Sequence, residues 1–220
     1  MAFGFSIEIW GDRALFTRPE LSVERVTYDV ITPSAARGII ESIYWHPGLH
    51  YVIDRIHVIN PIQFSSVRRN EVTDKASAKS MHAAILGNNE LPHINTQDKI
   101  AQRASVILVN VRYVIDFHFE ITKEASNDDN PGKFCDILKR RLRKGQCYSQ
   151  PYFGCREFPA NVCLVEGQQP KSFYEEAQIK DFGIMLYDMD HSNHDDITPM
   201  FYRAVMHNGV IDVSGSEVYR

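Results

Sequence analysis

Residues 106–121 contain the strongest structural pattern in this chain of 220 residues. Along this segment every second side chain is apolar or aromatic, namely Val111, Tyr113, Ile115, Phe117 and Phe119. Successive side chains of a strand point to opposite faces, so the spacing predicts one long strand, or two shorter ones, with a single buried face. Such a face must be covered by other elements, which requires a sheet and at least one packed layer.

A first helix is predicted after Thr32, which suits the N-cap position, with Pro33 at the first helical position. The apolar residues that follow at helical spacing are Ala36, Ile39, Ile40 and Ile43. The helix must stop before Pro47, because the residue before a proline disfavours helical geometry. Tyr44 and His46 are therefore expected at or just beyond its C-terminal end.

A second helix is predicted after the turn at residues 127–132, and Gly145 is placed to end it. Its apolar stripe consists of Phe134, Ile137, Leu138 and Leu142. The same helix holds six of the 24 Lys and Arg residues of the chain, although the net charge is -4. This concentration favours contact with phosphates, and the alternative is an ordinary solvated helix face.

Further strands are predicted over residues 3–10, 51–59, 162–165, 182–187, 201–206 and 210–213. We expect Gly11-Asp12 to break the first strand, and Asn208-Gly209 to form a hairpin turn between the last two. The order strand, helix, strand, strand, helix, strand is that of an α+β, ferredoxin-like domain. We therefore predict such a domain over residues 1–165, with an insertion at about 65–104 that includes a short helix. A C-terminal antiparallel β domain is predicted over residues 166–220.

Composition limits the function classes. The pI near 6.1 is too low for a uniformly basic nucleic-acid binder. No apolar run reaches the ~20 residues of a membrane helix, and the first ten residues do not resemble a signal peptide, so a cytoplasmic protein without membrane contact is expected. The four cysteines form no C-x-x-C pair, and the acidic segment 188–196 fits no metal-ligand pattern. No metal and no cofactor are expected.

Residues 146–156 interleave aromatic rings, amides, glycine and arginine, which is a composition suited to single-stranded RNA. Tyr148 and Tyr152 are expected to stack on bases. Phe153 fits either base stacking or the buried face of a strand.

Several short motifs, in order and at compatible spacing, resemble one known family. They are residues 10–17 (WGDRALFT), 38–47 (GIIESIYWHP), 52–54 (VID), 61–63 (PIQ), 111–113 (VRY), 154–157 (GCRE) and 205–209 (VMHNG). The chain resembles the CRISPR-associated Cas family five of subtype I-C (Dvulg), within the RAMP superfamily. The motifs run almost end to end, and residues 65–104 are covered least.

The resemblance implies a ferredoxin-like (RRM-like) domain with a glycine-rich loop and a smaller C-terminal β domain. It also implies metal-independent cleavage of precursor CRISPR RNA at the base of the repeat hairpin. The protein would then stay on the 5′ handle of the RNA as a subunit of the subtype I-C interference complex.

The resemblance also implies a catalytic site of a tyrosine, a lysine and a histidine. The tyrosine maps onto Tyr44 and the lysine onto Lys133, but the histidine position is occupied by Phe134. His46 and His118 are the candidates to replace the missing imidazole.

The residues expected to bind RNA are basic. They are Lys139, Arg140, Arg141, Arg143 and Lys144 in the second helix, with Arg13, Arg18, Arg156, Arg68 and Arg69 as weaker candidates for the same surface. Because Phe134 replaces a histidine, a subunit that grips the 5′ handle without cutting is the alternative to an enzyme. Nonspecific binding of duplex DNA by the same basic surface is a third hypothesis.

Overall fold

The strand predicted within residues 106–121 is longer than expected and lies at the centre of the molecule. In the computed structural model, which describes residues 4–21, 23–87, 92–176, 179–191 and 196–220, it is strand β5, Ile100–Ile121. It pairs antiparallel with β1 (Gly4–Ala14), β3 (Leu49–Val58) and β4 (Phe64–Val72). The result is a mixed α/β structure dominated by one large antiparallel sheet.

The remaining strands are β2 Arg25–Val26, β6 Asn161–Leu164, β7 Ile179–Asp190, β8 Thr198–His207, β9 Val210–Asp212 and β10 Val218–Tyr219. The helices are α1 Pro33–Ile43, α2 Ala78–Ile85, α3 Pro131–Lys144 and the short 3-10 helix η1 Pro19–Leu21. In the part of the chain that the structure describes, no helix has the length and apolar character needed to cross a membrane.

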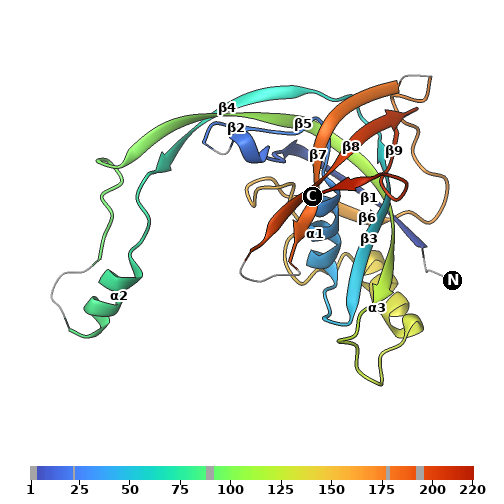
Figure 1. The fold of residues 1–220 in the computed structure, drawn as a ribbon, viewed down its shortest axis with the longest axis horizontal. Coiled ribbons are helices and arrows are strands. Elements are labelled where there is room, and N and C mark those ends of the chain that lie inside the picture. Colours follow the sequence, from blue (N-terminus) through green and yellow to red (C-terminus); the bar gives the residue numbers. More distant parts are fainter. Residues whose placement is uncertain (1–3, 22, 88–91, 177–178, 192–195) are drawn as a thin grey trace.

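The body is built from the elements β1, α1, β3, β5, α3 and β6 in chain order, and their strands lie side by side in the order β3-β5-β1-β6. The buried faces of α1 and α3 join the same core as the inward residues of these strands. In Figure 1 both helices lie with the sheet in the body of the molecule. The core therefore holds the C-terminal end of α1 and the first turn of α3 in fixed positions.

Each of the two helices α1 and α3 begins with a side-chain cap, and of the two only the Thr32 cap was predicted from the sequence. The Thr32 hydroxyl accepts a hydrogen bond from the Ala35 amide at 3.2 Å, and the Asn130 side chain accepts one from the Lys133 amide at 2.9 Å. Gly145 ends α3 with a left-handed φ of 61°. The cap at Thr32 and the end of α3 at Gly145 confirm the sequence predictions, whereas α3 begins at Pro131, inside the segment predicted as a turn.

The predicted break at Gly11-Asp12 is wrong. Strand β1 continues to Ala14, and Gly11 pairs with Val111 while Arg13 pairs with Val109. Because β5 extends well beyond this point, it provides a pairing partner that a local sequence pattern does not reveal.

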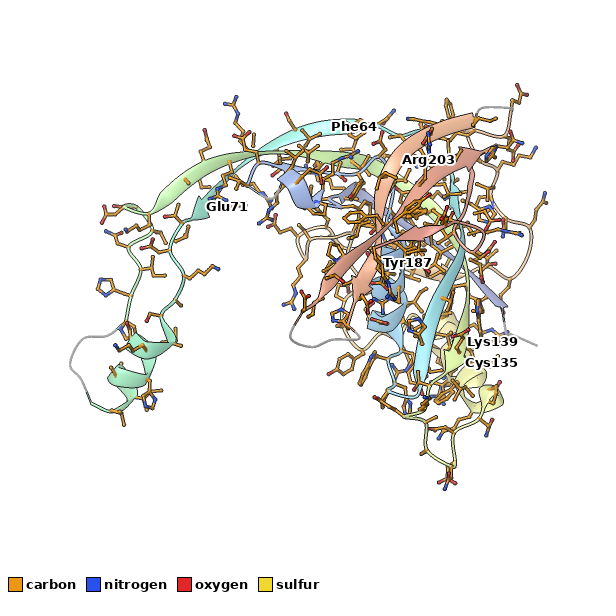
Figure 2. The ribbon with its side chains drawn as sticks, in the orientation of Figure 1. Phe64, Glu71, Cys135, Lys139, Tyr187 and Arg203 are labelled. Atoms are coloured by element: carbon orange, nitrogen blue, oxygen red, sulfur yellow. The ribbon has the colours of Figure 1, made fainter. Side chains whose placement is uncertain are left out.

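The insertion predicted at about 65–104 forms an arm that projects from the body (Figure 1). It consists of β4, the first part of β5 and the helix α2, and no residue of β4 or α2 is buried. Glu71, labelled on this arm in Figure 2, lies within 3.8 Å of Arg25, 3.7 Å of Arg69 and 3.6 Å of Arg103. Arg103 is thus engaged within the arm, while Arg69 also pairs with Glu157, outside the arm, at 2.9 Å.

The C-terminal strands β7 to β10 are antiparallel, and the Asn208-Gly209 turn has positive φ values of 50° and 82° as the hairpin prediction requires. Strand β9 also pairs with β3, so these strands continue the main sheet. Met185, Tyr202 and Ile211 belong to the same core as the N-terminal residues. The division into domains at residue 165 stays a prediction, which limited proteolysis would test.

Candidate active site

Tyr44 lies where α1 ends and the chain turns toward β3. Its backbone is extended, with φ -148° and ψ 111°, and its carbonyl accepts a hydrogen bond from the Tyr51 hydroxyl at 2.8 Å. The side chain is 8% exposed. Burial raises the pKa of the Tyr44 phenol, and the nearby charges of Arg141 and Lys133 oppose that rise. The phenol is therefore neutral near pH 7 and is a hydrogen-bond donor.

Lys133 lies in the first turn of α3, and its ammonium donates a hydrogen bond to the Asp129 carboxylate at 2.8 Å. The Asp129 side chain is only 2% exposed, while the Lys133 side chain is 45% exposed. This hydrogen bond lowers the pKa of the Asp129 carboxyl to about 2 and raises the pKa of the Lys133 ammonium. Lys133 is therefore a fixed, solvent-accessible cation.

His46 lies on the other side of Asp129. Its Nε2 atom is 3.8 Å from the second Asp129 oxygen, and its Nδ1 atom accepts the Gly48 amide hydrogen at 3.0 Å. Because Nδ1 accepts, the proton of the neutral ring belongs on Nε2, the atom that faces Asp129. The His46 side chain is 31% exposed, so this imidazole is accessible to a substrate.

Phe134, at the position where the resemblance expects a histidine, is fully buried. Its ring centroid lies 5.1 Å from that of His46 and 6.3 Å from that of Tyr44. An imidazole is thus present next to position 134, although it comes from a residue two positions after Tyr44. Of the two candidate replacements, only His46 lies in this cluster.

His118 lies elsewhere. Its Nδ1 atom is 2.9 Å from an Asp54 oxygen, across the strands β5 and β3. Its neighbour Phe119 packs against Phe134, and successive residues of a strand point to opposite faces. His118 therefore points away from the face of the sheet that contacts Phe134.

Two residues of the site were not assigned this role from sequence. Asp129 was predicted only as part of a turn, and Arg141 only as one of several RNA-binding cations. The Arg141 guanidinium lies 4.9 Å from the centroid of the Tyr44 ring, and its Nη1 atom donates to the Ile43 carbonyl at 2.6 Å. No local sequence signal reveals that Asp129 lies near His46 or that Arg141 lies near Tyr44, because each pair joins segments that are far apart in the chain.

The other basic residues differ in how free they are to contact RNA. Lys133, Arg140 and Lys144 are exposed and spaced to lie on one face of α3. By contrast, Arg143 pairs with Glu166 at 2.6 Å and Arg18 pairs with Asp29 at 3.2 Å.

Lys139, labelled on α3 in Figure 2, lies over the Phe5 ring at 5.8 Å. Arg13 and Arg156 are exposed, and in the same figure α3 lies well away from the arm that includes Arg68 and Arg69.

The structure also decides some predictions outside this cluster. Phe153 is fully buried against Phe16 and Tyr113, so it is a core residue and does not stack on RNA. Tyr148 is 84% exposed and Tyr152 is 38% exposed.

In the acidic segment 188–196, Asp188 pairs with Arg37 at 2.6 Å, and residues 192–195 lie outside the described part. Among the described residues, no group of three or more metal-ligating side chains is placed to hold an ion.

Comparison with known proteins assigns the chain to a family. The family described as CRISPR-associated protein (Cas_Cas5), in its Cas5d form, matches residues 5–214. A protein of Mannheimia succiniciproducens named CRISPR pre-crRNA endoribonuclease Cas5d is 46% identical over 220 residues, which covers 97% of this chain and 96% of the relative. A protein of Thermus thermophilus with the same name is 36% identical, over 83% of this chain and 72% of the relative.

A solved structure described as a CRISPR-associated protein has a TM-score of 0.71 and 26% identity, covering 100% of this chain and 97% of that one. The predicted family is confirmed: this chain belongs to the Cas5d family of CRISPR-associated proteins.

Proposed function

We propose that this chain is an endoribonuclease that cuts precursor CRISPR RNA, with Tyr44, Lys133 and His46 around the scissile phosphate. The observation that carries the proposal is the convergence of a phenol, an ammonium and an imidazole around Phe134 and Asp129. The names of the two relatives, both pre-crRNA endoribonucleases, support the substrate class.

In the proposed reaction the RNA supplies its own nucleophile. The 2′-oxygen forms a bond to the adjacent phosphorus, the bond from phosphorus to the 5′-oxygen breaks, and the 2′-proton leaves to water. The products are a 2′,3′-cyclic phosphate and a 5′-hydroxyl. The site must stabilise negative charge on the phosphorane oxygens and deliver a proton to the leaving oxygen, and neither task requires a metal.

Lys133 and Tyr44 suit the first of these tasks. The Lys133 ammonium is a compact cation with three donors, and the adjacent N-terminal turn of α3 also favours an anion. The neutral Tyr44 phenol donates a hydrogen bond to the same phosphate. Since burial raises the pKa of this phenol, Tyr44 is a poor base and its role is that of a donor.

His46 suits the second task, because its Nε2 atom carries a proton and faces Asp129. The form of the ring that donates a proton to the leaving 5′-oxygen is the imidazolium, and in that form Nδ1 also carries a proton and gives up the hydrogen bond from the Gly48 amide. In this role His46 supplies the imidazole that is missing at position 134.

We propose further that the protein stays on the 5′ handle as a subunit of the subtype I-C interference complex. The exposed line of Lys133, Arg140 and Lys144 supports contact with the handle phosphates. Incubation with its own repeat RNA in EDTA tests the activity, and a single defined cut is expected. Tight handle binding without products would instead identify a binding subunit. Equal competition by unrelated duplex DNA would identify a nonspecific binder.

We also propose that the body is a ferredoxin-like (RRM-like) domain. The chain order of β1, α1, β3, β5, α3 and β6 and the strand order β3-β5-β1-β6 support this assignment. In such a domain the C-terminal end of the first helix and the start of the second are held by one core, which is where Tyr44 and Lys133 lie.

The Tyr44→Phe variant tests the donor role of the phenol. Loss of a hydrogen bond to a charged group is expected to slow cleavage by about 10- to 100-fold. Because burial raises the pKa of Tyr44 above its ordinary ~10, the phenol does not ionise between pH 6 and 9, and the ratio of wild-type to variant rates should stay constant across that range. A ratio that grows with pH would instead indicate a phenolate base. Single-turnover rates at several pH values measure this ratio.

The Asp129→Asn variant tests whether Asp129 positions Lys133 and His46. Removal of an acidic group beside an RNA site should tighten RNA binding by about 2- to 5-fold. Cleavage should nevertheless slow by about 10- to 100-fold, because the ammonium and imidazole lose their shared partner. These opposite changes in affinity and rate distinguish positioning from a general effect of charge.

Asp128→Asn is the matched control for this prediction. Asp128 is exposed and adjacent, so its replacement changes the net charge equally while the hydrogen bond between Lys133 and Asp129 is kept. It should tighten binding and leave the rate unchanged. Equal rate losses in the two variants, or no loss in Asp129→Asn, would contradict the positioning role.

A further inference from the structure

Next to the cluster lies a cavity of about 210 Å³, between the C-terminal end of α3, the segment 145–151 and strand β6. Its wall includes Arg141, Gln146, Gln150 and Asn161. Ligand sites for drug-sized molecules usually measure ~300–1,000 Å³, so this volume suits a smaller planar group.

The segment that forms one wall is held in place by its backbone. The backbone amides of Tyr148 and Ser149 donate to the Ser42 carbonyl at 2.8 and 3.1 Å, and the backbone amide of Gln146 donates to the Arg141 carbonyl at 2.9 Å. The segment is therefore fixed to both α1 and α3, and its exposed side chains are presented from a defined backbone.

The chemistry of the wall favours a nucleobase. A side-chain amide carries both donors and an acceptor, which is what the edge of a base requires. The Gln150 amide nitrogen already donates to the Pro151 and Ala160 carbonyls at 3.4 and 3.5 Å, and the Asn161 amide nitrogen donates to the Trp10 carbonyl at 3.3 Å, so these two residues offer mainly their side-chain oxygens as acceptors. Pro151 and Val162 add apolar surface for the face of a ring. None of the described residues that line the cavity is acidic, which disfavours a cationic ligand. A phosphate would need more positive charge than the single Arg141.

Arg141 connects this cavity to the proposed catalytic cluster. Arg141 is one of the residues that line the cavity, and its guanidinium lies 4.9 Å from the Tyr44 ring centroid. Ile43, whose carbonyl binds Arg141, lines the cavity as well and directly precedes Tyr44. A base held here would therefore belong to a nucleotide next to the bond that is cut.

We propose that this cavity is a specificity site that binds one unpaired nucleobase flanking the scissile phosphate, read by the amides of Gln146, Gln150 and Asn161. The proposal rests on the proposed endoribonuclease function and adds to it the part of the substrate that is recognised. Sequence-specific recognition of RNA commonly uses bases that are turned out of the stack and bound by their edges.

The test combines protein variants with RNA that lacks single bases. A series of repeat RNAs is made in which one ribose lacks its base, at each position within about three nucleotides of the cut. Single-turnover cleavage of each RNA is measured with wild type and with the double variant Gln146→Ala/Gln150→Ala. At one position the abasic substitution should slow wild type by about 10- to 100-fold. On intact RNA the double variant should be slower than wild type by a similar factor. The abasic substitution at that position should slow the double variant only slightly further, because the two changes remove the same contact.

The matched control is Gln168→Ala/Gln169→Ala, the same two changes in an exposed segment that does not line the cavity. It should retain the wild-type rate and the wild-type sensitivity to the abasic position. Independent, multiplicative effects at every position, or a wild-type rate in the cavity variant, would overturn the proposal.

Affinity measurements separate this proposal from the proposed function. If the protein does not cut, the same RNA and variant series is repeated as binding at a stated salt concentration. Coupling between the cavity variant and one abasic position would support the base site while refuting cleavage. Absence of coupling in binding as well as in cleavage would refute the base site.

Discussion

Replacement of His46 by phenylalanine is expected to slow cleavage of the repeat RNA by about 100- to 10,000-fold, the usual loss for one general acid–base group. The reason is that His46 alone supplies an imidazole to the described cluster, with Nε2 facing Asp129 and its ring against Phe134. Single-turnover rates measure the loss, and melting temperatures check that the variant is folded. The matched control is His118→Phe, which removes an imidazole that pairs with Asp54 on the other face of β5.

The exchanged variant His46→Phe/Phe134→His sharpens this prediction. The two rings are in contact, so the exchange keeps one phenyl and one imidazole in nearly the same volume. We expect it to recover at least about 10-fold of the rate lost by His46→Phe, since either position brings the imidazole to the cluster. A wild-type rate in His46→Phe, or an equal loss in His118→Phe, would contradict the assignment of His46.

Replacement of Lys133 by alanine is expected to slow cleavage by about 100- to 1,000-fold, the loss found when one group that stabilises transition-state charge is removed. Lys133 is held by Asp129 at 2.8 Å, and its side chain is still 45% exposed, so it is both positioned and accessible. Since the hydrogen bond to Asp129 raises the pKa of Lys133, the ammonium stays charged throughout the neutral range.

Lys144→Ala is the control, because Lys144 lies on the same exposed face of α3 but at its opposite end. Its loss should weaken RNA binding and reduce the salt dependence of binding, with little change in the rate on saturated enzyme. Lys133→Arg should be faster than Lys133→Ala but slower than wild type, because a planar guanidinium does not replace a compact ammonium. Unchanged cleavage by Lys133→Ala would refute the role of Lys133.

Much of the fold follows from local sequence rules. The alternation at residues 111–119, the cap at Thr32, the helix end at Gly145 and the turn at Asn208-Gly209 each depend on neighbouring residues, and the structure confirms them. The break expected at Gly11 failed because a long partner strand overrides a local turn signal. Propensity is a weak guide wherever tertiary pairing is available.

The candidate site was predictable only in part. The family resemblance pointed to Tyr44 and Lys133, and His46 was one of two histidines considered for the missing imidazole; their catalytic roles stay predictions. Asp129 was not predicted as a site residue. Its contact with Lys133 is local, but its proximity to His46 depends on how α1 and α3 meet, which the sequence does not reveal. The same docking brings Arg141 to Tyr44 and forms the cavity beside them, and neither is encoded in a short motif.

The central claim is that the protein positions RNA for attack by its own 2′-oxygen. A repeat RNA with a single 2′-deoxy nucleotide on the 5′ side of the cut tests it most directly, in EDTA and beside the all-ribose RNA. We predict that the all-ribose RNA is cut once to a 2′,3′-cyclic phosphate, while the deoxy RNA binds equally well and is not cut. Cleavage of the deoxy RNA at the same place, or a product with a 3′-hydroxyl, would contradict the account.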